Sequence, residues 1–137
     1  MRVLFDTNVV LDVLLDRAPF RETSAQVVAR VERNELTGVL GATTLTTIYY
    51  LMTKSSGRET ARSAVRDLLG LFQIAAVDRQ VLAAAVESPL KDLEDAVLVE
   101  AGRLESIDAV VTRDPDDFRD GGFPIFSPQE LNAALSH

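Results

Sequence analysis

The chain has 137 residues, 47% of them hydrophobic, so we expect one domain with a real core, spanning residues 1–137. No segment approaches the roughly 20 apolar residues that cross a bilayer, and the opening "MRVLFD" lacks the parts of a secretory signal, so a cytoplasmic protein is expected. The 21 acidic and 14 basic residues give a net charge of −7. This charge argues against nucleic-acid binding through a general positive field, but it leaves local contacts open.

The side chains available as metal ligands narrow the choice of ion. The chain contains no cysteine, and its one histidine is the last residue, His137. Disulfides and thiolate sites are therefore excluded, and a bound metal would be held by oxygen atoms. Oxygen ligands favour a hard cation such as Mg²⁺ or Mn²⁺ over zinc.

The first half of the chain predicts strands and helices in alternation. "RVLF" at 2–5 is a short apolar strand, and two helical patterns follow at 8–15 and 19–33. "TGVLGA" at 37–42 is strand-like and bounded by glycines. "TTLTTIYYLM" at 43–52 predicts a helix despite its threonines, because its large apolar residues repeat at steps of three and four, and "SSG" ends it.

The second half continues this alternation. Helices are predicted at 58–70, 78–87 and 92–105, with a further short helix near the C-terminus, and strands are predicted at 72–77, 109–112 and 123–126. Such alternation predicts an α/β fold in which helices cover both faces of a central parallel sheet, giving three layers. Ligands of open parallel sheets bind beyond the carboxyl ends of the strands, where the strand order reverses.

Polar side chains follow the first predicted strand in "LFDTNVVLD", residues 4–12. Asp6 stands at the carboxyl end of this strand, and Asn8 and Asp12 lie on the helix that follows. Asp6 is therefore a candidate site residue. The alternative is that Asp6 or Thr7 only caps the helix, because these residue types often do so.

A second acidic group occurs in "KDLEDAVLVEAG", residues 91–102. One helical face carries Asp92, Asp95, Val99 and Gly102. Val99 and Gly102 have the character of sheet-packing residues, so Asp95 shares a buried stripe, where a carboxylate is costly without a partner. The alternative is that Asp92 caps the helix and Asp95 only complements its dipole. Glu94 is expected to turn away into solvent.

A third acidic group follows the β-branched strand in "VVTRDPDDF", residues 110–118. Asp114 lies closest to the strand end at Thr112, so it is the natural partner of Asp6 at the same sheet edge. Asp116 and Asp117 can also be explained as turn residues after a proline. Although the three acidic groups are far apart in sequence, all of them fall near one edge of the predicted sheet.

Three carboxylates in one cleft repel one another unless a cation neutralises them. A divalent ion with oxygen ligands would do so. Such an ion also lowers the pKa of a bound water and stabilises charge on a phosphoryl oxygen, which is the chemistry of phosphodiester hydrolysis.

The three motifs "LFDTNVVLD", "DLEDAV" and "VVTRDPDDF", in this order, resemble the PIN domain family, and particularly its small bacterial VapC-type toxins of toxin–antitoxin pairs. The resemblance implies an α/β/α fold and a Mg²⁺- or Mn²⁺-dependent ribonuclease, usually a homodimer, that an antitoxin encoded beside it inhibits. By position, Asp6, Asp95 and Asp114 would be the catalytic, metal-binding acids. Asn8 and Thr112 would orient them, and Asp117 would assist.

The sequence departs from the family pattern at Thr47. Many family members carry a glutamate at this position, and threonine is a poor metal ligand. The resemblance then implies either that Asp92, Asp117 or Asp12 compensates, or that metal affinity and turnover are reduced. For Asp12, a solvated position on its helix is the favoured alternative.

Contact with RNA needs positive charge. Arg58, Arg62 and Arg66 form an i, i+4 stripe that could meet a phosphate backbone, although a merely solvated face explains them equally well. Arg113 is better placed, beside Asp114. Of Tyr49 and Tyr50, which could stack on bases, at least one is expected in the core.

Other classes of protein also place aspartates at strand ends. A haloacid-dehalogenase-like phosphatase needs a second aspartate where this chain has Asn8, and a phosphoacceptor receiver needs a lysine near the last strand, where none occurs. Both therefore fit poorly. The stronger rival is a PIN-like module that has lost activity with its glutamate and acts by binding RNA or protein.

Overall fold

The computed structural model of the chain describes residues 1–136, and its centre is a five-stranded parallel sheet. The strands are β1 (Arg2–Phe5), β2 (Thr37–Gly41), β3 (Gln73–Ala75), β4 (Ala109–Val111) and β5 (Ile125–Phe126). Their order across the sheet is β3-β2-β1-β4-β5. Strand order therefore reverses between β1 and β4, which is where ligands of such sheets bind.

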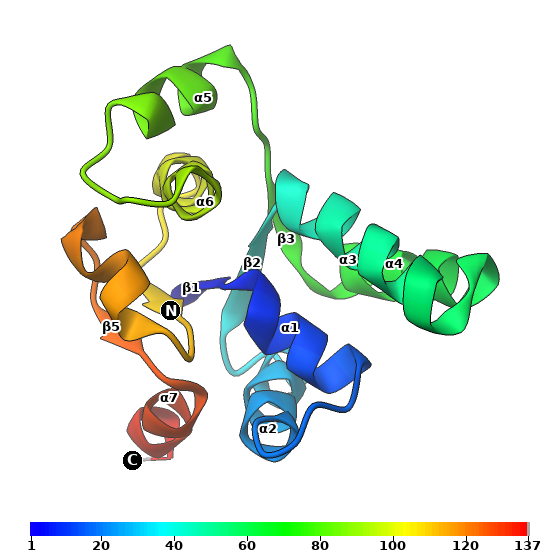
Figure 1. Cartoon of the computed structure of the whole chain (residues 1–137). Coiled ribbons are helices and arrows are strands. Elements are labelled where there is room, and N and C mark those ends of the chain that lie inside the picture. The colour runs from blue at the N-terminus through cyan, green and yellow to red at the C-terminus, as the bar shows by residue number, and fades with distance from the viewer. Residues whose placement is uncertain (137) are drawn as a thin grey trace.

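Helices cover both faces of the sheet, as the sequence predicts (Figure 1). They are α1 (Thr7–Leu14), α2 (Arg21–Glu32), α3 (Ala42–Ser56), α4 (Arg58–Leu71), α5 (Arg79–Val86), α6 (Leu93–Leu104) and α7 (Pro128–Leu135), with the 3₁₀ helix η1 at Pro115–Gly121. In the view of Figure 1, α5 and α6 lie above the sheet and α1, α2 and α7 below it. The helices α3 and α4 pack as a pair on the right.

The alternation of side chains along β1 separates two cores. Val3 and Phe5 point into the core shared with α1, α2, α3 and α4, whereas Leu4 points into the core under α5 and α6. All three side chains are fully buried. Phe5 also meets Phe72 edge to face, with ring centroids 5.1 Å apart. Burial on both faces explains why residues 3–5 of β1 form an unbroken apolar run.

Close packing of α6 on the sheet fixes the position of the second acidic group. A Cβ added at Gly102 would lie 2.9 Å from Ile107 Cδ1 and 3.4 Å from Leu4 Cδ2, so a larger residue would push the helix away. Val99 is also buried. The predicted role of these two residues in packing against the sheet is confirmed, and the N-terminus of α6 is thereby held at the sheet edge.

The elements agree with the sequence predictions except at a few boundaries. The helix predicted to end at residue 52 continues to Ser56, and the strand predicted over residues 72–77 is only Gln73–Ala75. The structure adds η1, where the sequence analysis considered only a turn after Pro115. Within residues 1–136, no helix combines the length and the apolar composition required to span a membrane.

Candidate functional site

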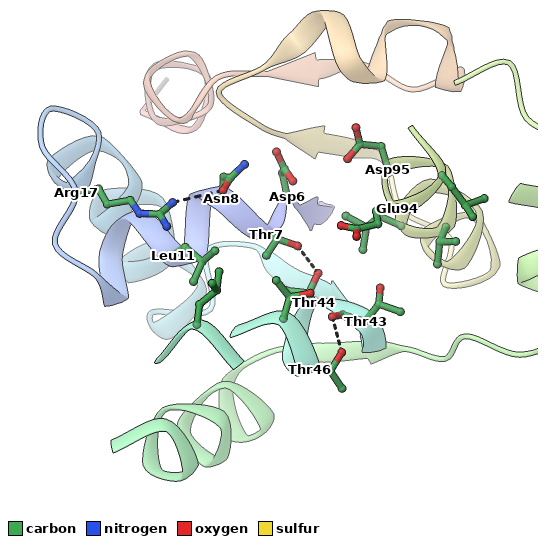
Figure 2. Close-up of a pocket in the computed structure, with 15 residues that line it drawn as sticks. Asp6, Thr7, Asn8, Leu11, Arg17, Thr43, Thr44, Thr46, Glu94 and Asp95 are labelled. Carbon is green, nitrogen blue, oxygen red and sulfur yellow. Dashed lines mark hydrogen bonds between the residues drawn. The ribbon is translucent and has the colours of Figure 1, made fainter. Parts of the chain in front are cut away.

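A cleft of about 450 Å³ opens at the carboxyl end of the sheet, beside the point where strand order reverses (Figure 2). Its polar side includes residues from α1, α3 and α6. Its lining consists of Asp6, Thr7, Asn8, Leu11, Arg17, Thr43, Thr44, Thr46, Thr47, Leu51, Leu93, Glu94, Asp95, Val97 and Leu98. The structure therefore brings the first two predicted acidic groups together in one cavity.

Asp6 is positioned by β1 and β4 and does not act as a capping side chain. It occupies the position before α1, where its carboxylate accepts no well-formed capping hydrogen bond, although the Thr7 and Asn8 backbone N–H groups lie near enough to lower its pKa. Instead the Thr112 hydroxyl donates to Asp6 Oδ2 at 2.8 Å, and the same hydroxyl accepts a hydrogen bond from the Asp114 backbone N–H at 3.0 Å. Thr112 thus connects the first and third acidic groups.

The environment of Asp6 disfavours its charge. The side chain is 6% exposed, and this burial raises its pKa above the ordinary value. The hydrogen bond from Thr112 lowers the pKa, and the nearby Asp114 carboxylate raises it. A cation at this position would remove part of the cost of holding Asp6 ionised.

Asp95 is the most strongly perturbed acid. It lies in the first turn of α6, half-buried, and its backbone N–H donates to Asp92 Oδ1 at 3.0 Å. Burial raises the pKa of Asp95 to about 7, and the charges of Asp92, Asp6, Asp117 and Glu94 add to this effect. The suggestion that Asp92 caps this helix is confirmed, but Asp95 does more than complement the dipole, because it faces both Asp6 and Asp92.

A second, smaller depression adjoins the cleft and shares Asp95 with it. Asp92, Asp116, Asp117 and Asp120 line it together with Pro89, Leu90 and Lys91. The third acidic group is therefore divided: the charge of Asp114 raises the pKa of Asp6, and the charge of Asp117 raises the pKa of Asp95. Asp114 lines neither the cleft nor this depression.

These carboxylates can be tested against the divalent ion that the sequence implies. In residues 1–136, no group of three or more Asp, Glu, His or Cys side chains lies close enough to hold one ion in common. The raised pKa values of Asp6 and Asp95 nevertheless indicate negative charge that lacks compensation. Mg²⁺ commonly keeps several waters and uses only one or two carboxylates. The donor set fits such a hydrated ion, and the three-carboxylate ligand set stays a prediction.

Three further residues line the cleft. Asn8 and Thr47, both partly buried, lie where the sequence analysis expected them, on α1 and α3. Glu94 is exposed to solvent, as expected, but the expectation that it turns away from the site is wrong, because it also lines the cleft (Figure 2). An acid that the sequence analysis set aside therefore adds negative charge beside Asp95.

Asp12 is buried, and the prediction that it is solvated is wrong. Its side chain is completely inaccessible and forms ion pairs with Arg113, whose Nε lies 2.9 Å from Oδ2, and with Arg17, whose Nη1 lies 3.8 Å from Oδ1. Burial raises the pKa of Asp12, while Arg113 and Arg17 lower it. Because the two arginines enclose its carboxylate, Asp12 cannot replace the missing glutamate at the cleft.

The structure separates the candidate RNA contacts from the cleft. Arg113 is held by Asp12 and lies over the Phe20 ring, 4.3 Å from its centroid. Arg58, Arg62 and Arg66 are exposed on α4, outside the cleft lining. Tyr49 packs against the core, as expected of one of the two tyrosines, and the exposed Tyr50 carries Lys54 over its ring.

Sequence reasoning missed Arg17, the basic residue of the cleft. It follows α1 in "LLDRAPF", a segment that carries no helix or strand periodicity. The proline at position 19 was the available signal, because it predicts a turn. A turn there can bring the chain back toward the helix that precedes it. The nearby hydrogen bond between the Thr7 and Thr44 hydroxyls, 2.8 Å long, was equally hidden, because it joins two helices.

Comparison with known proteins identifies the family. A family model described as PIN domain matches residues 2–116, and no curated protein sequence matches the chain significantly. The chain is similar to the solved structure of VapBC2 from Rickettsia felis bound to a promoter DNA fragment, with a TM-score of 0.71, 14% identity, and 93% of this chain and 98% of that chain covered.

Two further structures agree with this match. One is VapC20 of Mycobacterium tuberculosis, described as a toxin that cleaves the sarcin–ricin loop, with a TM-score of 0.70, 16% identity, and 88% of this chain and 95% of that chain covered. The other is a toxin–antitoxin complex from Klebsiella pneumoniae, with a TM-score of 0.68, 22% identity, and 92% and 97% covered. Such identities show a shared fold, and together with the family match over most of its length they establish that the chain belongs to the PIN domain family.

Proposed function

We propose that this protein is a metal-dependent endoribonuclease that hydrolyses RNA phosphodiester bonds, and that it is the toxin of a toxin–antitoxin pair. The observation that carries the proposal is the meeting of Asp6 and Asp95, which are far apart in the sequence, in one cleft where both have raised pKa values. Perturbed carboxylates at the switch point of a parallel sheet are typical of a catalytic site.

Asp6, Asp95 and Asp114 would hold a Mg²⁺ or Mn²⁺ ion. When bound, such an ion supplies an activated water and neutralises charge on the phosphodiester. Thr112 keeps Asp6 aligned through its hydroxyl and keeps Asp114 near through the backbone N–H that it accepts. The amide of Asn8 lines the same cleft. Asp117 lies in the neighbouring depression, and its charge raises the pKa of Asp95.

The walls of the cleft support a ligand of nucleotide size. Leu11, Leu51 and Leu98 add apolar surface to the lining, and the volume of about 450 Å³ lies within the range of about 300–1,000 Å³ usual for ligand sites. An apolar wall limits the water around the reacting groups and strengthens the electrostatic interactions between them.

An antitoxin partner and a homodimer belong to the same proposal. The structures from Rickettsia felis and Klebsiella pneumoniae are complexes of toxins with antitoxins, and they share the fold of this chain. A small neighbouring gene that encodes a DNA-binding protein would favour the toxin role. Its absence would leave the nuclease proposal standing without that role.

The test is cleavage of a mixed RNA pool by the purified protein, with Mn²⁺ or Mg²⁺ and with EDTA. We expect cleavage that requires the metal and that disappears in Asp6→Asn. Asp67→Asn is the matched control, because Asp67 is exposed on α4 and outside the cleft, so it should cleave as the wild type does. A folded wild-type protein that cuts no RNA under either metal would overturn the proposal.

A catalytically weakened module that acts by binding RNA or protein is the second candidate. Two points favour it: Thr47 lines the cleft where the family resemblance implies a glutamate, and no three acids within residues 1–136 are close enough to share an ion. This candidate predicts RNA binding by the wild type without metal-dependent cleavage, so the same assay together with a binding measurement separates the two.

A further inference from the structure

The proposed substrate is a polyanion, yet most of the charged side chains that line the cleft are acidic. Of its lining residues in the described part of the chain, Asp6, Glu94 and Asp95 are acids, and Arg17 is the one basic residue. An acidic protein with a net charge of −7 has little general field to hold RNA, so a local cation must receive the backbone. Arg17 is therefore the side chain to consider first.

The backbone of Arg17 is fixed on both sides. Its N–H donates to the Asp12 carbonyl oxygen at 2.9 Å, and its own carbonyl accepts from the Arg21 N–H at 2.8 Å. These bonds hold the turn between α1 and α2 in place, so the Arg17 side chain starts from a rigid position. Binding groups on rigid positions lose less entropy when a ligand arrives.

The side chain of Arg17 is directed into the cleft but only loosely held. Nη1 lies 3.5 Å from Asn8 Oδ1 and 3.8 Å from Asp12 Oδ1, and the side chain is 35% exposed. Figure 2 shows the guanidinium beside Asn8, with Asp6 beyond it along the cleft. These long contacts orient the planar group and leave most of its five N–H donors free for a phosphate.

Arg113 forms a closer ion pair with the same aspartate and gives a contrast to Arg17. Its Nε lies 2.9 Å from Asp12 Oδ2, its guanidinium stacks on Phe20, and it does not line the cleft. Asp12 therefore forms a close ion pair with Arg113 and a longer one, which orients the side chain, with Arg17. Without a buried anion, Arg17 would be drawn toward the acids of the cleft.

We propose that Arg17, steered by Asn8 and the buried Asp12, binds an RNA phosphate next to the one that is cleaved. This inference rests on the proposed ribonuclease function, because it takes RNA as the substrate. It differs from the expectation that Arg113 or the α4 arginines bind the RNA, since Arg17 is the basic residue that the structure places in the cleft.

The test is equilibrium binding of a fluorescently labelled short single-stranded RNA of mixed sequence, measured by anisotropy at several salt concentrations. Asp6→Asn in Mg²⁺ serves as the background that binds without cutting, and the wild type in EDTA serves as a second. We expect Arg17→Ala to weaken binding about tenfold or more at low salt, since hydrogen bonds to charged groups are strong. The slope of the logarithm of the binding constant against the logarithm of the salt concentration should become shallower by about 0.7, the change expected when one contact to a single-strand phosphate is lost.

Two variants and a control separate binding from structure. Arg17→Lys should keep the salt slope but lose part of the affinity, because lysine keeps the charge without the planar fork. Arg17→Gln keeps an amide that can bond Asn8 and should reproduce the loss of slope if Arg17→Ala folds poorly. Arg21→Ala removes the same charge from an exposed side chain that pairs with Asp16, so its affinity and slope should match those of the background protein.

The outcomes distinguish this inference from the proposed function. If folded Arg17→Ala and Arg17→Gln bind RNA with unchanged affinity and slope while the wild type cleaves, the role of Arg17 is wrong and the nuclease stands. If the slope changes as expected but no metal supports cleavage, Arg17 binds phosphate in a protein that is not a nuclease. Failure of the background protein and of the wild type to bind RNA at low salt overturns the inference.

Discussion

Arg113 and Asp12 form an ion pair across the site, with Nε 2.9 Å from a carboxylate that has no exposed surface. Arg113 stands between Thr112, which holds Asp6, and Asp114, so this pair ties the turn after β4 to α1. The third acidic group is thus fixed by a contact remote from its own strand.

Replacing Asp12 should therefore destabilise the protein. We expect Asp12→Asn to lower the free energy of unfolding by about 2 kcal/mol, because leaving Arg113 and Arg17 without their anion outweighs the relief of no longer burying a charge. The loss is smaller than for a fully buried pair, because Arg113 is partly exposed. Asp16→Asn is the matched control, since Asp16 pairs with Arg21 at the surface and should cost under about 0.5 kcal/mol. Urea unfolding measures both, and equal effects would show that the buried pair contributes nothing special.

Thr112→Val should reduce activity more than stability. Valine keeps the shape but removes the donor to Asp6 and the acceptor for the Asp114 N–H. We expect RNA cleavage to fall about 10- to 100-fold and the Mn²⁺ requirement to rise, as for other groups that orient metal ligands. Thr53→Val is the control, because its hydroxyl bonds only the Tyr49 carbonyl within α3. Normal cleavage by Thr112→Val would remove Thr112 from the site.

Metal-free protein should lose stability as pH rises. The folded pKa of Asp95 is about 7 against an ordinary value of 3.8, so its protonated form is the one the fold prefers. The contribution is complete below about pH 3.8 and is lost as pH rises through 7. In EDTA, thermal unfolding should show wild type losing stability relative to Asp95→Asn across this interval.

The control for this comparison is Asp67→Asn, which changes an exposed acid on α4. Its pH profile should run parallel to that of the wild type. If the profile of Asp95→Asn also runs parallel to the wild type, Asp95 is not held in the environment described here.

Adding a carboxylate at position 47 should tighten the binding of the metal ion. Thr47 lines the cleft on α3, so Thr47→Glu would add a carboxylate facing the other acids. We expect half-maximal cleavage at a lower Mn²⁺ concentration and a less stable metal-free protein, because like charges then repel. Ser56→Glu adds the same charge at an exposed position of α3 outside the cleft and should change the Mn²⁺ requirement less. Equal effects of the two variants would mean that general charge, and not position 47, matters.

How far the site could be predicted depends on which contacts build it. Asp6 and Thr112 were predictable as neighbours, because parallel strand ends meet at one sheet edge and each residue directly follows or ends a strand. The placement of Asp95 was predictable too, since Val99 and Gly102 mark the face of α6 that meets the sheet.

Residues placed by turns or by distant partners could not be predicted. Asp12 appears on an ordinary helix and becomes buried only because Arg113, far along the chain, covers it. Arg17 reaches the cleft because a turn reverses after α1, and periodicity carries no information about the direction of a turn. The position of Glu94 could not be predicted either, because an exposed residue on a helix can line a cleft or face open solvent.

The central place of β1 has a consequence for synthesis on the ribosome. β1 is made first, but its neighbour β4 and the Thr112 hydroxyl that aligns Asp6 are 106 residues away. A nascent chain therefore carries an unpaired strand edge and an unaligned Asp6 until Thr112 has been translated. Chains that stop before residue 112 would be inert as well as unstable, so the finished protein is the first form of the chain in which this constellation of acids exists.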